Sequence, residues 1–210
     1  MLQHAHWNKM INILNTKWIK QTIWYVFSSK GQEAKKVSEF LKEQLDTYDT
    51  ELNELLDDIN CRNLTEDRKV MKILRWVNRH FTYVSDRIQY KEAEHWATIG
   101  ESLSSMKGDC EDGAILIYCL ARKAGIPIAQ IKLVAGNVKG GGHAWVRYIS
   151  KKYPLVVYFI DWCYWYDTNS IGTTKTAYFD YNNNKIIGDD NYYNYWFLVD
   201  EDKGYKKVKW

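Results

Sequence analysis

The sequence has only 2 prolines, no long apolar run and almost no excess of charge of one sign. Its apolar stretches 23–27 and 155–165 are short or interrupted by Asp161, whereas a membrane-spanning helix needs about 20 apolar residues. The 29 basic and 26 acidic residues leave a net charge of +3, too little to indicate electrostatic binding to nucleic acid or to a membrane surface. We therefore expect no nucleic-acid partner and no membrane insertion.

Cysteine pairs typical of metal sites are also missing. The four cysteines form no CxxC pair and show no spacing typical of zinc ligands. The N-terminus carries His and Lys residues among scattered apolar ones and does not resemble a signal peptide. We therefore expect a cytoplasmic protein with free thiols and no cofactor, although a virion- or phage-associated setting stays open.

The chain is rich in aromatic residues and otherwise ordinary for a globular protein. It has 46% hydrophobic residues, which excludes a disordered or collagen-like chain. The 10 Trp and 16 Tyr suit a core, a carbohydrate cleft or a peptide groove, because their rings combine apolar area with a polar group. Composition does not decide among these three uses.

Periodic patterns predict helices first and strands afterwards. Apolar residues at steps of three and four predict a helix or a helix pair over 33–59, and a second helix follows a cap at Thr65. A third helix begins at Asp109, its expected N-cap, and ends at Gly125. The remaining predicted elements are a helix at 7–14, extended segments at 22–27 and 81–84, antiparallel strands at 128–138, 143–149 and 155–161, and short strands near 176–179 and 195–199. This order indicates one α+β domain.

Cys110 is the candidate nucleophile because it lies at the start of the third predicted helix. Unpaired N–H groups and the positive end of the helix dipole favour a thiolate there. Its acidic neighbours Asp109, Glu111 and Asp112 oppose this effect, so a cationic partner is needed. His143 follows three glycines that would leave room for a substrate backbone, and it is the expected partner.

The other cysteines lack this placement. Cys119 follows Cys110 by nine residues and lies on the opposite side of the helix, where we expect an inert core thiol. Cys163 follows a strand end, and Cys61 lies in a polar connection. A metal site built from Cys110, His143, Asp161 and Cys163 would use acceptable ligand types. It has no supporting spacing, so we expect no metal.

Short motifs occur in a characteristic order along the middle of the chain. They are Trp76-Val77-Asn78, Tyr83-Val84-Ser85-Asp86, Trp96-Ala97-Thr98, Glu101-Ser102-Leu103, Gly108-Asp109-Cys110-Glu111-Asp112, Gly125-Ile126-Pro127, Gly142-His143-Ala144-Trp145-Val146 and Asp161. Over about residues 60–170 this series resembles the transglutaminase-like superfamily, particularly its bacterial cysteine peptidases. The resemblance implies a papain-like α+β fold in which the nucleophile opens a central helix packed on an antiparallel sheet.

The resemblance also implies roles for individual residues. Cys110, His143 and Asp161 correspond to the nucleophile, the base and the group that orients the base in a triad acting through a thioester. Family members often carry Gln and Pro where this chain has Ala97 and Ile99. The oxyanion hole would therefore rest on the backbone N–H of Cys110 and on another donor, for which the indole of Trp96 is the candidate.

The catalytic core is assigned to residues 61–170, with a mainly helical extension at 1–60 and a β-rich extension of the same domain at 171–210. The expected activity is cleavage of a peptide or carboxamide bond in a protein or peptide substrate. A transglutaminase with an amine acceptor shares the first half-reaction. A non-catalytic binding or structural module on the same fold is a third reading, and the oligomeric state is not readable from the sequence.

Strand pairing distinguishes Asp161 from Asp167 as the partner of His143. If the five residues 150–154 form a hairpin loop, Ile149 faces Leu155 and His143 lies directly opposite Asp161. Directly opposed side chains share a sheet face, with Cβ atoms about 4.5–5.5 Å apart. A slip of one residue would turn Asp161 to the other face.

Overall fold

The computed structural model describes residues 29–164, 178–180, 185–187 and 192–205. The helix expected at 7–14, the extended segment at 22–27, part of the strand near 176–179 and Asp167 lie outside these residues. The division of the chain at residues 60 and 170 stays a prediction. Within the described part, no helix combines the length and apolar character needed to cross a membrane.

Six helices are described. The predicted helix pair is confirmed, the second helix follows Thr65, and the third begins at Cys110. Two short helices were not predicted. One of them has a recognisable signal, because Thr98 and Glu101 form a capping box at its start. The helices are α2 (Ser29–Thr47), α3 (Asp49–Ile59), α4 (Glu66–His80), α5 (Asp86–Gln89), α6 (Ile99–Ser105) and α7 (Cys110–Lys123).

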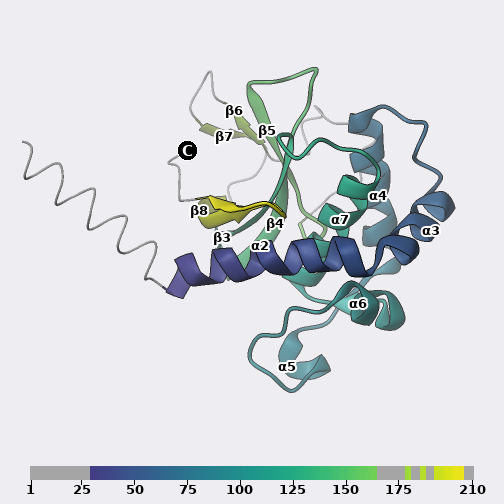
Figure 1. Cartoon of the computed structure of the whole chain (residues 1–210). Coiled ribbons are helices and arrows are strands. Elements are labelled where there is room, and N and C mark those ends of the chain that lie inside the picture. The colour runs from purple at the N-terminus through teal and green to yellow at the C-terminus, as the bar shows by residue number, and fades with distance from the viewer. Residues whose placement is uncertain (1–28, 165–177, 181–184, 188–191, 206–210) are drawn as a thin grey trace, which may run out of the picture.

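The strands form two sheets within the described residues. Two-residue strands β1 (Thr82–Tyr83) and β2 (Lys107–Gly108) pair in parallel. The larger sheet has the order β7-β6-β5-β4-β3-β8-β9, and all its pairs are antiparallel (Figure 1). Its strands are β3 (Ile131–Val138), β4 (Gly141–Ile149), β5 (Val156–Ile160), β6 (Tyr178–Asp180), β7 (Lys185–Ile187), β8 (Tyr192–Val199) and β9 (Gly204–Tyr205).

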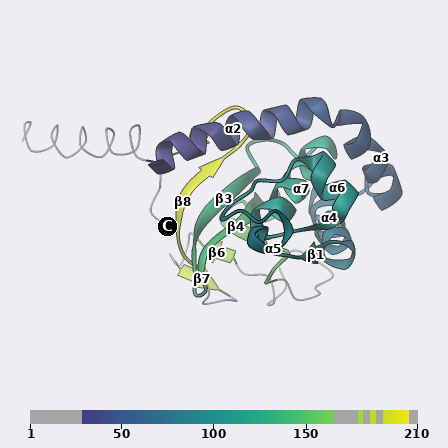
Figure 2. The ribbon, with the colours of Figure 1, turned by 90° about the horizontal axis from the view of Figure 1, so that it is seen from below.

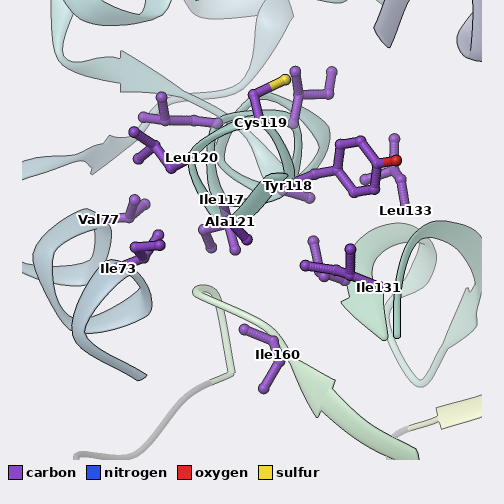
Figure 3. Close-up of a cluster of buried hydrophobic side chains, with 14 of the residues drawn as sticks. Ile73, Val77, Ile117, Tyr118, Cys119, Leu120, Ala121, Ile131, Leu133 and Ile160 are labelled. Carbon is purple, nitrogen blue, oxygen red and sulfur yellow. The ribbon is translucent and has the colours of Figure 1, made fainter. Parts of the chain in front are cut away.

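Helix α7 is buried between the sheet and the other helices. The long helix α2 runs alongside β8 and α7, and α4 packs on another side of α7 (Figures 1 and 2). Residues 111–121 of α7 are all buried, as expected for a helix that is apolar nearly all round. Figure 3 shows α7 side chains meeting Ile73 of α4, Ile131 of β3 and Ile160 of β5. This packing holds α7 against the sheet and against α4.

Cys119 belongs to this core. Its exposed fraction is 0%, and burial raises the pKa of its thiol. The expectation of a buried core thiol at this position is confirmed.

The predicted hairpin register is wrong by two residues. Ile149 pairs with Val157 rather than with Leu155, and Val146 pairs with Ile160. Turns from Ser150 to Tyr153 and from Tyr153 to Val156 lengthen the connection. Because side chains alternate with a period of two, this shift leaves Asp161 on the face predicted for it. Asp161 is therefore diagonal to His143 rather than directly opposite.

Candidate active site

The first turn of α7 places Cys110 in one cleft with His143 and Ala144 of β4, a central strand of the sheet. Asp109 occupies the N-cap position, as predicted, and its backbone N–H donates to Asp112 Oδ2 at 3.1 Å, the reciprocal bond of a capping box. Asp112 Oδ1 accepts from the backbone N–H of Ala97 at 2.9 Å. Asp112 therefore joins the start of the helix to the segment that precedes α6.

The thiol of Cys110 is held in its neutral form. Burial raises its pKa far above the ordinary value, and the neighbouring carboxylates of Glu111 and Asp109 raise it further. The thiol donates to Glu111 Oε2 at 3.0 Å. A backbone hydrogen bond involving Ala144 acts in the opposite direction and lowers the pKa. Burial is therefore the largest influence on the Cys110 thiol, and the sequence pattern could not reveal it.

His143 and Asp161 form a buried pair. His143 Nε2 lies 2.6 Å from Asp161 Oδ2, and the exposed fractions of the two residues are 7% and 3%. Tyr192 donates its hydroxyl to the same oxygen at 2.8 Å, and the backbone N–H of Cys163 donates to Oδ1 at 2.9 Å. Both carboxylate oxygens therefore have donors that fix the orientation of Asp161. Because Nε2 is paired with Asp161, Nδ1 is the imidazole nitrogen that can accept a proton.

Two irregularities in β8 supply aromatic residues to the site. The pairing of β3 with β8 skips Trp196 between Tyr195 and Phe197, and skips Tyr193 further along. A β-bulge of this kind redirects the side chains beside it. Tyr192 reaches Asp161, while Trp196 lies over Gly142, where an added Cβ would be 2.8 Å from the indole ring. Sequence periodicity carries no signal for a bulge, and both residues were missed.

Trp162 fixes the segment that carries Asp161. Its indole N–H donates to the carbonyl of Cys110 at 3.4 Å, and its own carbonyl accepts from Asn78 Nδ2 at 3.1 Å. The indole lies so close to Gly113 that an added Cβ would be 2.2 Å from its Nε1 atom. Gly113 therefore allows Trp162 to cross the first turn of α7.

Cys110 and His143 line one cleft of about 330 Å³. The predicted residues Trp96 and Asp109 also line it, whereas Asp161 lies behind His143. The indole N–H of Trp96 donates to Glu94 Oε1 at 3.3 Å, so Trp96 does not aim a free donor at the cleft here. The lining residues that sequence reasoning did not assign are Tyr83, Glu94, Glu111, Ala135, Gly142, Ala144, Trp196 and Phe197.

A cluster of carboxylates lies beside the thiol. Oxygen atoms of Asp86, Asp109 and Asp112 lie within 4.8 Å of one another, and Asp86 also groups with Glu94 and Glu111. Among the described residues, Asp86 Oδ1 and Asp109 Oδ1 are buried without a hydrogen-bond partner. Burial raises the pKa of Asp86, and it raises that of Asp112 to about 7. These oxygens fit a hard cation such as Ca²⁺, which takes only oxygen ligands.

The structure thus places a thiol at the start of a buried helix, in one cleft with an imidazole that is paired with a carboxylate, in a mixed helix and sheet fold. The family comparison identifies the class of this fold. The model of the transglutaminase-like superfamily matches residues 53–166, more than half of the chain, so the protein belongs to this superfamily. No curated protein matches the chain.

Solved structures of Legionella pneumophila LapG are similar to this chain. The calcium-bound form has 18% identity and a TM-score of 0.49, covering 75% of this chain and 76% of LapG. The EGTA-treated form has 17% identity and a TM-score of 0.49, covering 81% and 86%. A further LapG structure has 18% identity and a TM-score of 0.48, covering 80% and 87%.

Proposed function

We propose that the protein is a cysteine-dependent acyl-transfer enzyme that cleaves a peptide or carboxamide bond in a protein or peptide. Membership of the transglutaminase-like superfamily supports this reaction class. The observation that carries the proposal is the pairing of Cys110 and His143 in one cleft, with a buried Asp161 on the far nitrogen of the imidazole.

The proposed reaction begins with transfer of the Cys110 proton to His143 Nδ1 as the sulfur attacks the substrate carbonyl. Asp161 holds the proton on Nε2 and stabilises the imidazolium. The backbone N–H of Cys110, at the start of α7, is a donor for the oxyanion. The imidazolium then protonates the leaving amine, and a thioester forms on Cys110.

Water completes a hydrolase reaction, and an amine would complete a transglutaminase reaction. We favour water because the cleft beside Cys110 is bordered by the carboxylates of Asp109 and Glu111, which can hydrogen-bond a water molecule. Mass spectrometry distinguishes the two outcomes, since hydrolysis gives a free acid and transamidation gives an adduct with an added lysine analogue.

The test is labelling with a peptide that carries an electrophile in place of the scissile carbonyl, followed by peptide mapping. We expect one adduct on Cys110, none in Cys110→Ala, and an unchanged adduct in Cys61→Ser. A folded Cys110→Ala variant that retains cleavage activity would refute the proposal. A label on Cys163 instead would show that the nucleophile is misassigned.

We also propose that a hard divalent cation binds Asp86, Asp109 and Asp112. The unpartnered buried oxygens of Asp86 and Asp109 support this site. A bound cation would supply positive charge that offsets the carboxylates around Cys110 and favours its thiolate. Calcium titration monitored by isothermal calorimetry should give one site in the native protein and none in Asp86→Asn. Equal binding by both proteins would contradict this assignment.

A further inference from the structure

A second thiol lies beside the imidazole and carboxylate pair. Cys163 follows Asp161 by two residues, and its backbone N–H donates to Asp161 Oδ1 at 2.9 Å. Ligand atoms of His143, Asp161 and Cys163 all lie within 4.8 Å of one another. The proposed reaction gives Cys163 no role, so its position needs another explanation.

These three side chains offer one nitrogen, one oxygen and one sulfur atom. Zn²⁺ binds all three types at about 2.0–2.3 Å, commonly in tetrahedral sites with three protein ligands and an open fourth position. At such bond lengths, ligand atoms lie roughly 3–4 Å apart. The imidazole and carboxylate, now 2.6 Å apart, would open to admit the ion, and the three ligand atoms already lie within 4.8 Å of one another. The carboxylate cluster near α7 contains only oxygen and suits a harder ion.

We propose that His143, Asp161 and Cys163 form an inhibitory zinc site. His143 lines the cleft, which gives the ion a route to the site. His143 and Asp161 are already oriented, because the carboxylate is held by Tyr192 and by the Cys163 backbone. The carboxylate is therefore held in place before the metal binds, and the metal replaces its contact with the imidazole.

Binding has a defined proton balance. The Cys163 S–H bond is replaced by a Zn–S bond, and its proton leaves to solvent. The imidazole proton moves from Nε2 to Nδ1 as Nε2 binds zinc. Nδ1 can then no longer accept the proton of Cys110, so zinc removes the base from the triad without touching the nucleophile.

The test uses the full-length Cys110→Ala protein, in which the nucleophile cannot bind metal. Co²⁺ is titrated as a spectroscopic substitute for Zn²⁺, with excess Ca²⁺ present to occupy carboxylate sites. We expect thiolate-to-cobalt charge-transfer absorption that zinc displaces. Adding Cys163→Ser should abolish this absorption and weaken zinc binding by about 100-fold, because loss of even an outer-shell partner costs roughly 10–100-fold. Adding Cys61→Ser instead should change neither the absorption nor the strength of zinc binding.

Persistence of the absorption in the Cys110→Ala, Cys163→Ser protein would overturn the proposal, as would zinc binding of unchanged strength. Circular dichroism checks that each variant is folded. A second measurement uses the chain with Cys110 intact, where zinc should slow alkylation of Cys110 much more in the unsubstituted protein than in Cys163→Ser. Because metal binding is measured without turnover, failure of the proposed acyl-transfer reaction would leave this result interpretable.

Discussion

Cys110 is subject to opposing influences from residues within two positions of it. The start of α7 favours negative charge, whereas burial and the carboxylates of Asp109 and Glu111 disfavour it. The thiol donates to Glu111 rather than to the imidazole in this structure. The ion pair with His143 that the proposed reaction needs therefore requires the thiol to leave Glu111.

Replacing Glu111 with Gln should make Cys110 more reactive. Burial raises the pKa of Glu111 itself to about 9, so the change removes a charge that raises the thiol pKa mainly above that pH, where the thiolate fraction rises about tenfold for each unit by which the thiol pKa falls. The rate of iodoacetamide alkylation, followed from pH 7 to above the Glu111 pKa, measures this effect. Glu54→Gln, an exposed change on α3, is the matched control and should leave the rate unaltered. A slower reaction of Glu111→Gln would show that Glu111 assists thiolate formation.

Asp161→Ala should lower the rate of turnover by orders of magnitude. The imidazole would lose the group that holds its proton on Nε2, and Tyr192 would lose its acceptor. Asp167→Ala, at the alternative position considered from the sequence, should keep most of the activity. Steady-state kinetics with a cleaved peptide measure both variants. Equal losses in the two variants would contradict the assignment of Asp161.

At the scale of whole elements, the contact between α7 and the segment after β5 aligns the two halves of the site. The indole N–H of Trp162 donates a hydrogen bond to the carbonyl of Cys110, and the carbonyl of Trp162 accepts one from Asn78 of α4. The same segment supplies Asp161 to His143 on β4. The relative position of the thiol and the imidazole therefore depends on how closely Trp162 approaches α7.

Gly113→Ala should damage both stability and activity. The new methyl group would lie 2.2 Å from Trp162 Nε1, and overpacking of this kind typically costs about 1–3 kcal/mol. Urea unfolding and peptide cleavage are the two measurements. Gly140→Ala is the control for stability, because its Cβ would lie 3.6 Å from the hydroxyl of Tyr164, an ordinary contact. Unchanged activity of Gly113→Ala would mean that the contact with Trp162 does not align the site.

At the scale of the whole molecule, the buried carboxylates link folding stability to pH. Asp112 has a pKa of about 7 in the folded protein, raised mainly by burial from 3.8. Between about pH 4 and 7, the folded state holds a proton that the unfolded state has lost. Stability must therefore fall as the pH rises through this window, and the effect of Asp112 levels off above it.

Asp112→Asn should reduce this dependence, and the slope that remains belongs mainly to Glu111, whose pKa is raised by burial to about 9. The free energy of unfolding of the unsubstituted protein should decrease by up to a few kcal/mol between pH 5 and 8, since one pKa unit corresponds to about 1.4 kcal/mol. Urea titrations with EGTA present measure the slope without a bound divalent ion. An Asn side chain has one acceptor oxygen where Asp112 has two, so the variant should be less stable at every pH. The slope of the unfolding free energy against pH is therefore the informative quantity. An unchanged slope in Asp112→Asn would assign the pH dependence to other groups.

The sequence determined the local features that depend on neighbours along the chain. Periodicity and capping residues predicted the α2–α3 pair, α4 and α7, and alternation of β-branched residues predicted β3 to β5. Cys110 was placed at a helix start because Asp109 and the apolar residues after it are adjacent in sequence. Asp161 lies on the predicted face of the sheet although the predicted register was wrong, because the error was two residues, the period of a strand.

Tertiary structure alone decided the electrostatic state of the thiol and the identity of the supporting residues. Burial is a property of the packed molecule, so the raised pKa of Cys110 could not be derived from its neighbours in sequence. The bulges in β8 depend on pairing with β3. They bring Tyr192 to Asp161 and Trp196 to Gly142, which lie 31 and 54 positions away along the chain. The clustering of Cys163 with His143 and Asp161 likewise arises from strand pairing and from a hydrogen bond within the following turn.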